Sequence, residues 1–355
     1  MEHNKNNRPQ EPQQPYPYHE EEVSYENAAD QVVLSGILTL PNKLGIFPAV
    51  VLIAGYGPND RNASGMGHKY FLVLADYLTR SGIAVLRFDK RGVGSSTGDY
   101  KSATHDDLLS DALAGVTFLK TRPEIDQRNI GLIGLSEGGL IAAMGAAHSP
   151  DISCAVLMAP AVATTIDDML YHTALQLKAD GASEEFIARD QVTRRAVCDI
   201  IRHEMDGECA RQRMRAIIEQ YLRELPESQQ HEAEKLPFAF TQAKLDGMLA
   251  TFSSPGYRSF LTSDHSTLLQ GIKIPILVVT GGHDFISSAE RTFPLFARAM
   301  ELSGNECTLI GLPYLNHMFQ TCKTGSLMEY GTIEETMSPA AMKIISDWIL
   351  SHIRI

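Results

Sequence analysis

Short apolar runs alternate with longer segments of helical character along most of the chain. One run, residues 47–53 (FPAVVLI), is apolar throughout, which is typical of a strand covered on both faces. This alternation favours a mainly parallel sheet with helices on both faces, that is, an α/β fold. The runs that we interpret as strands cover residues 32–40, 47–53, 84–88, 130–134, 154–158, 274–280 and 307–312.

Helical signals fill the intervals between these runs. Residues 68–80 repeat apolar side chains at helical spacing. Thr104 begins a second helix, with Asp107 in the position where a capping box usually holds Glu or Gln. Three more helices are expected over residues 137–147, 288–299 and 339–353.

The pattern changes in the second half of the chain. From about residue 164 to residue 242 the sequence is helical and rich in charge, with no strand signal, before the alternation resumes. We interpret this segment as a helical cap inserted into a single α/β domain. The expected division is a core at 21–163 and 266–355 and a cap at 164–265.

The first 20 residues have a composition of their own. They are biased towards Asn, Gln and Pro, and they lack the apolar stretch of a secretory signal peptide. We expect residues 1–20 to form either a disordered leader or a strap along the surface.

Charge and cysteine content disfavour several classes of partner. Acidic residues outnumber basic ones by 43 to 31, and the formal net charge of −12 argues against nucleic acid or an anionic membrane. No apolar run approaches the length that spans a bilayer. The five cysteines are irregularly spaced, without a Cys-x-x-Cys pair, which disfavours a metal site or a disulfide framework. We therefore expect a cytoplasmic protein that uses no metal or cofactor and acts on a small molecule. Its oligomeric state leaves no signal in the sequence.

Residues 134–138 read Gly-Leu-Ser-Glu-Gly and match the pattern Gly-x-Ser-x-Gly. They lie where a predicted strand ends and a predicted helix begins, which is the context of a nucleophile elbow. Such a turn exposes the serine hydroxyl at a helix N-terminus, where developing negative charge is stabilised. Ser136 is therefore the candidate nucleophile. The alternative is a glycine-rich structural turn without a catalytic role.

A serine nucleophile needs a base, and the base needs an acid to orient it. In this class of fold the three follow one another in the order serine, acid, histidine. Asp284 is the first acidic residue after the run at 274–280, and His317 follows the last strand. Open α/β sheets place their sites at these strand ends. We predict a triad of Ser136, Asp284 and His317. The alternative is an aspartate that caps a turn and a solvated loop histidine.

The tetrahedral intermediate of acyl transfer needs two backbone donors. The amide of Glu137, directly after the nucleophile, is one candidate. The amide of Tyr56, in the loop at 54–62, is the other. A plain turn at Gly57-Pro58 would also explain that loop.

Five segments of the sequence are similar to those of a known group of enzymes. On the basis of these segments, the chain resembles bacterial α/β-hydrolase esterases and serine-aminopeptidase-like hydrolases from about residue 23 to residue 353. The resemblance implies hydrolysis of carboxylic esters without a cofactor, under a helical cap. The chain departs from the family pattern at Tyr56, where a small residue is expected, and at Asn62, where an acid is expected. The segments are GYGPNDR at 55–61, FDKRGVGSS at 88–96, GLSEGG at 134–139, SPGYRSF at 254–260 and NHMFQ at 316–320.

The expected activity is that of a serine carboxylesterase, acting on esters of small to medium acyl chain through an acyl-enzyme. Tyr257 and Phe260 either line the acyl pocket or pack the cap against the core. Two alternatives stay open: a serine peptidase or amidase with the same triad, and a non-catalytic binding protein of the same fold.

Overall fold

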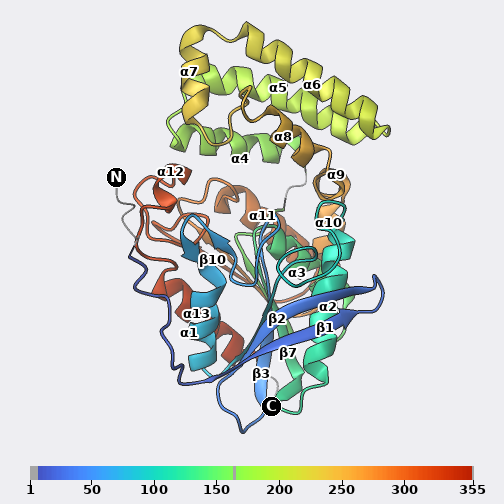
Figure 1. Cartoon of the computed structure of the whole chain (residues 1–355), viewed down its shortest axis with the longest axis vertical. Helices are drawn as coiled ribbons and strands as arrows, with labels where there is room; N and C mark the ends of the chain where they lie inside the picture. The colour runs from blue at the N-terminus through green and yellow to red at the C-terminus, as the bar shows by residue number, and fades with distance from the viewer. Residues whose placement is uncertain (1–6, 163–164, 354–355) are drawn as a thin grey trace.

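A central sheet of eight strands organises the computed structural model, which describes residues 7–162 and 165–353 (Figure 1). The strand order is β1-β2-β6-β3-β7-β8-β9-β10. β2 runs antiparallel to both β1 and β6, and the other neighbours in the sheet are parallel. The predicted mainly parallel sheet is therefore confirmed. The strands are β1 (His19–Asn27), β2 (Val32–Leu40), β3 (Phe47–Ile53), β6 (Ala84–Phe88), β7 (Ile125–Leu135), β8 (Cys154–Met158), β9 (Ile276–Gly281) and β10 (Cys307–Leu312).

Five of these strands have the bounds that the apolar runs predict, namely β2, β3, β6, β8 and β10. β1 was not predicted, because its sequence HEEEVSYEN has neither an apolar run nor a regular alternation. It is an edge strand, and edge strands tolerate charge because one side faces solvent. Its pairing with β2, from His19 opposite Leu40 to Asn27 opposite Val32, gives it a place in the sheet.

Helices cover both faces of the sheet and bury two separate apolar clusters. One cluster includes Leu108, Leu140 and Phe296, and the other includes Leu74 and Ile345. α2 (His105–Lys120), α3 (Glu137–His148) and α11 (Ala289–Ser303) form the first layer, and α1 (Tyr70–Arg80) and α13 (Pro339–Ser351) form the second. Smaller elements are β4 (Ser64–Gly65), β5 (His68–Lys69) and α12 (Leu327–Tyr330).

The predicted start of α2 is confirmed in detail. The Thr104 hydroxyl accepts a hydrogen bond from the Asp107 amide at 3.2 Å, and the Asp107 carboxylate accepts one from the Thr104 amide at 2.7 Å. Two backbone donors at the helix start are thus satisfied, which is the function of a capping box.

Seven helices lie between β8 and β9, and they are the only regular structure among the described residues there. Figure 1 shows α4 to α8 as a layer beyond one end of the sheet, joined to it through α9 and α10. This cap has its own apolar core, which includes Phe186, Ile218 and Phe240. Residues 163–164, at one expected boundary, lie outside the described residues, and the exact division of core and cap stays a prediction. The helices are α4 (Ile166–Ala179), α5 (Glu184–His203), α6 (Gly207–Glu224), α7 (Glu227–Lys235), α8 (Leu245–Phe252), α9 (Pro255–Thr262) and α10 (His265–Gln270).

The described part of the N-terminal segment is fastened to the surface. The Arg8 guanidinium donates to the carbonyls of Gly331 at 2.8 Å and Ile333 at 2.6 Å. The Gln10 side chain donates to the Met337 carbonyl at 2.7 Å. Residues 1–6 of the expected leader lie outside the described residues. In the part of the chain that the structure covers, no helix is long and apolar enough to cross a membrane.

Candidate active site

Ser136 occupies a strained turn between β7 and α3. Its backbone has φ 57° and ψ −116°, a left-handed conformation that non-glycine residues rarely adopt. A Cβ atom on Gly134 would lie 1.9 Å from the Gly138 carbonyl oxygen, and one on Gly138 would lie 2.0 Å from that of Ile53. Only glycine fits at both positions. The close packing of strand and helix therefore explains both the motif and the strained serine.

Asp284 and His317 form a buried pair between the loops after β9 and β10. His317 Nδ1 lies 3.0 Å from both carboxylate oxygens of Asp284. Asp284 is 1% exposed and also accepts the amides of Ile286 at 3.0 Å and Ser287 at 2.9 Å. A carboxylate only accepts hydrogen bonds, so Nδ1 must carry the proton of the neutral ring and Nε2 is left as the basic nitrogen. The structure thus brings together the two residues that the sequence placed in separate loops.

The loop that holds Tyr56 approaches the serine closely and is anchored on both sides. A Cβ atom on Gly55 would lie 3.3 Å from the Ser136 Cβ. Lys90 Nζ donates to the Gly55 carbonyl at 2.6 Å, and the Gly57 amide donates to the Tyr100 hydroxyl at 2.8 Å. The amide of Tyr56 lies between these anchors, so the candidate oxyanion donor belongs to a loop whose backbone is fixed.

The Glu137 side chain links the same anchors to the start of α3. Its Oε2 accepts from Lys90 Nζ at 2.9 Å and from the Tyr100 hydroxyl at 3.4 Å, and its Oε1 lies 3.4 Å from His105 Nε2. Burial alone would raise the pKa of Glu137. The charge of Lys90 and the hydrogen bond from His105 outweigh it and lower that pKa to about 2. The carboxylate is therefore ionised near neutral pH.

The sequence predicts only a backbone role for Glu137 and no role for Lys90, Tyr100 or His105. Lys90 lies in the FDKRGVGSS segment, and the only available signal is that a lysine is unusual two residues after a buried strand. Its side chain is 4% exposed.

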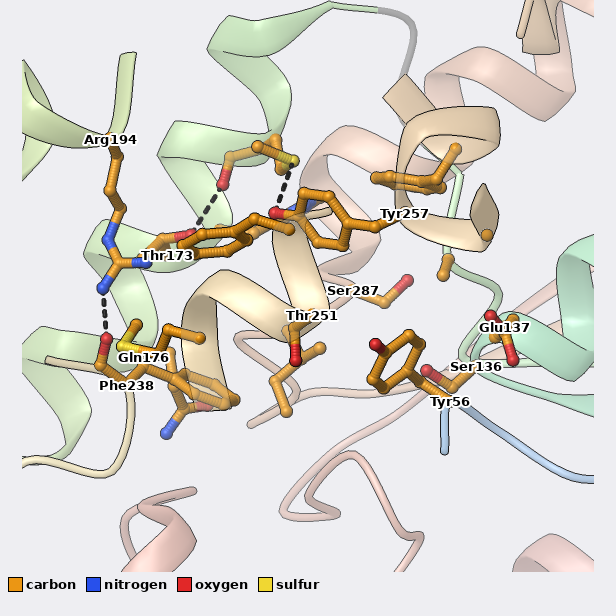
Figure 2. A pocket seen from close by; sticks show the side chains of 18 of the residues that line it. Tyr56, Ser136, Glu137, Thr173, Gln176, Arg194, Phe238, Thr251, Tyr257 and Ser287 are labelled. Atoms are coloured by element: carbon orange, nitrogen blue, oxygen red, sulfur yellow. Dashed lines mark hydrogen bonds between the residues drawn. The ribbon is translucent and has the colours of Figure 1, made fainter. Parts of the chain in front are cut away.

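A cavity of about 660 Å³ extends from Ser136 into the cap. Figure 2 shows Tyr56, Ser136 and Glu137 at one end and Arg194, Gln176 and Phe238 at the other. Tyr257 and Phe260, the predicted substrate-binding residues, both line this cavity, and both also pack on the apolar core of the cap. The two roles that the sequence left open for them, lining the pocket and packing the cap, are therefore compatible.

The cap reaches the loop that carries Asp284. His172, on α4, lies with Nε2 3.2 Å from the Ser288 hydroxyl and lines the cavity. Burial lowers the pKa of His172, against the opposing effect of the Asp284 charge. Within the described residues, no group of three or more His, Cys, Asp or Glu side chains is placed to hold a metal ion. None of the five cysteines, all of which lie in the described residues, forms a disulfide.

Known proteins resemble this chain in segments of sequence. Esterase EstD of Thermotoga maritima is 34% identical over 108 residues, which are 30% of this chain and 26% of that protein. Thiohydrolase apmlB of Arthrinium phaeospermum is 33% identical over 136 residues, 37% of this chain and 40% of the other. These alignments span less than half the length of the curated relatives.

Solved structures resemble this chain over nearly its whole length. An esterase of Pyrococcus furiosus aligns with a TM-score of 0.52 and 20% identity, covering 94% of this chain and 93% of the other. The α/β hydrolase GrgF of a Penicillium species aligns with a TM-score of 0.55 and 17% identity, covering 94% and 99%. At these identities the likeness concerns the fold, and it confirms the predicted α/β-hydrolase architecture.

A family profile gives the assignment that the fold alone does not. The profile of the X-Pro dipeptidyl-peptidase (S15 family) matches residues 30–310, which include the strained serine, Asp284 and most of the sheet and the cap. The chain therefore belongs to the S15 family of X-Pro dipeptidyl-peptidases, built on the α/β-hydrolase fold.

Proposed function

We propose that this protein is a serine hydrolase that cleaves carboxylic esters of small to medium acyl chain through an acyl-enzyme. The observation that carries the proposal is the strained Ser136, held at φ 57° in the wall of a cavity whose lining is mostly apolar. The Asp284–His317 pair supports it, because such a pair is the orienting half of a triad.

Each residue of the candidate site has a defined role in this reaction. Ser136 Oγ attacks the acyl carbonyl carbon while His317 Nε2 takes its proton, and the amides of Tyr56 and Glu137 hold the resulting oxyanion. The tetrahedral intermediate collapses to the acyl-enzyme, and the leaving alkoxide takes the proton from His317. Water then attacks the acyl group with His317 again as base, which releases the acid and restores Ser136.

The family profile is a specific argument for a peptidase, and the cavity lining is an argument against one. A peptidase that removes dipeptides must hold the α-ammonium group of its substrate, which requires an available carboxylate. Among the described lining residues, Glu137 is the only acid, and its oxygens are engaged by Lys90, His105 and Tyr100. The lining therefore favours an ester whose acyl group carries no ammonium.

Hydrolysis of matched esters and anilides by one preparation tests the proposal. We expect kcat/KM for p-nitrophenyl butyrate to exceed that for alanyl-prolyl p-nitroanilide, because an amine is a poorer leaving group than a phenol. Ser136→Ala and His317→Ala should each lower ester turnover by about a thousandfold or more, and Asp284→Asn by at least about tenfold. A fluorophosphonate probe should label the wild type and not Ser136→Ala, which separates an enzyme from a non-catalytic binding protein.

Ser149→Ala, at the other end of the same helix, is the matched control and should keep wild-type rates. Anilide cleavage equal to or faster than ester cleavage, and lost in Ser136→Ala, would replace the esterase by the peptidase. Full ester turnover in Ser136→Ala would remove the serine from the mechanism.

A further inference from the structure

The end of the cavity that is remote from Ser136 is polar, although the walls leading to it are largely apolar. In Figure 2 the cap residues Arg194, Gln176 and Phe238 lie at this end, opposite Ser136 and Tyr56. The apolar side chains of the lining include Leu140, Val162, Met169, Met248, Phe252 and Ile286. An acyl chain that starts at Ser136 would run along this largely apolar lining before it meets the polar end.

Arg194 provides the first positive charge at this end. Its guanidinium donates through Nε to Asp190 and through Nη2 to the Phe238 carbonyl, and it lies 4.5 Å from the centre of the Phe240 ring. Asp190 is fully buried and balances its charge. The remaining terminal nitrogen, Nη1, has no hydrogen bond to any described residue. Arg194 is thus held in place by its neighbours with one donor group unused.

Lys244 provides the second positive charge, and it has no balancing acid. Its ammonium donates to the carbonyls of Leu236 at 2.5 Å and Pro237 at 3.2 Å, which leaves one of its three protons unused. No carboxylate among the described residues forms an ion pair with it. Burial lowers the pKa of Lys244, and no acid counteracts this effect. Its two acceptors directly precede Phe238 in the chain, so Lys244 and Arg194 hold three consecutive carbonyls at the same end of the cavity.

The balance of charge at this end is therefore positive. Arg194 and Asp190 cancel, Lys244 remains, and the one acid in the described lining, Glu137, lies at the opposite end beside Ser136. We propose that Lys244 and Arg194 bind a carboxylate at the far end of the acyl chain, so that the preferred esters carry an ω-carboxylate. This inference rests on the proposed ester hydrolysis at Ser136 and adds the substrate class.

The physical reason is the surroundings of the two cations. Hydrogen bonds between a carboxylate and a charged donor are stronger than neutral ones, and a cavity with apolar walls screens them less than water does. Because the donors are already fixed by the Leu236, Pro237 and Phe238 carbonyls, little side-chain entropy is lost on binding. A cation at this position also repels an ammonium group in the same place.

Paired esters of equal chain length test the inference. We compare kcat/KM for mono-p-nitrophenyl suberate and p-nitrophenyl octanoate, with the short pair of succinate and butyrate as reference. In the wild type, the ratio of carboxylated to neutral ester should be higher for the long pair than for the short pair. In Lys244→Gln, which keeps a donor for the carbonyls and loses the charge, the long-pair ratio should fall about tenfold or more.

Lys235→Gln is the matched control, because Lys235 is an exposed lysine at the end of α7 and does not line the cavity. It should leave both ratios unchanged. Lys244→Arg should restore most of the long-pair ratio. A wild-type long-pair ratio no higher than the short-pair ratio would overturn the inference. An equal loss of kcat/KM on both long esters in Lys244→Gln would also overturn the inference, because Lys244 would then only stabilise the cap.

A binding measurement separates this inference from the proposed function. Monomethyl suberate is titrated calorimetrically into Ser136→Ala and into Ser136→Ala/Lys244→Gln. We expect binding in the first and about tenfold weaker binding in the second. If the wild type hydrolyses no ester but this difference is found, the proposed function fails and the carboxylate site stands. Equal affinities in the two variants would remove the site while ester hydrolysis by the wild type still stood.

Discussion

Glu137 is a carboxylate surrounded by three donors, and its charge contributes to stability in a defined pH range. The pKa of its carboxyl is lowered from 4.5 to about 2 in the fold. A group whose folded-state pKa is depressed stabilises above the unfolded value and loses that contribution as the pH falls towards the folded value. The contribution of Glu137 is therefore complete above about pH 4.5 and declines between pH 4.5 and pH 2.

We predict that Glu137→Gln makes unfolding less dependent on pH in this range. Between pH 5 and pH 3 the wild type should lose about 2 kcal/mol of stability that the variant does not lose. Urea unfolding at both pH values measures the difference. The variant should keep much of its ester turnover near neutral pH, because the proposed oxyanion donor is the backbone amide of residue 137. Turnover as low as that of Ser136→Ala would mean that the carboxylate takes part in the reaction.

Individual residues of the site differ in how far the sequence could reveal them. Ser136, Asp284 and His317 each follow a strand that an apolar run predicts, so chain order and strand ends predict them as a candidate triad. The partners of Glu137 could not be selected in this way. Lys90 is 47 residues away in the chain, and only the folded sheet brings it to the start of α3.

At the scale of elements, segments with a local signal were predicted and segments fixed by distant contacts were not. The apolar runs gave the bounds of β3 and β8, and the capping residues gave the start of α2. β1 has no such signal, because its position is determined by pairing with β2. The place of the N-terminal strap also depends on distant partners, since Arg8 bonds to carbonyls more than 300 residues further along the chain.

We predict that Arg8→Ala destabilises the protein. The Arg8 guanidinium donates to the carbonyls of Gly67 at 2.9 Å, Gly331 at 2.8 Å and Ile333 at 2.6 Å. Loss of a charged donor should lower the free energy of unfolding by about 1–3 kcal/mol, as judged from the usual worth of such bonds. Urea unfolding at neutral pH measures it. Arg128→Ala is the control, because Arg128 is 66% exposed and, among the described residues, forms an ion pair only with Asp126. Equal effects of the two substitutions would show that the strap adds no stability.

At the scale of the whole molecule, the candidate site lies between the sheet domain and the cap, which have separate apolar cores. The sheet and its helices supply Ser136 and the Asp284–His317 pair, and the cap supplies most of the cavity lining beyond them. The sequence showed that an insertion interrupts the α/β alternation between the serine and the acid. It could not show the shape of the cavity, because that shape depends on how the cap helices pack on one another and over the sheet.

Because the cap supplies most of the cavity lining beyond Ser136, we predict that the cap controls selectivity for acyl-chain length. Met248, on α8, lines the cavity, and Met248→Ala removes most of its side chain there. Because α8 belongs to the cap and Ser136 to the sheet domain, the added space is on the cap side of the cavity, and longer acyl groups should gain more than short ones. We expect the ratio of kcat/KM for p-nitrophenyl octanoate to that for the acetate to rise by about threefold or more, and the ratio for the butyrate to change less.

Met205→Ala is the matched control, since Met205 also belongs to the cap but is 82% exposed, and it should leave the ranking of the three esters unchanged. If Met248→Ala scaled all three esters by one factor, the cap would stabilise the fold without selecting the acyl chain, and selectivity would have to reside in the loops of the sheet domain.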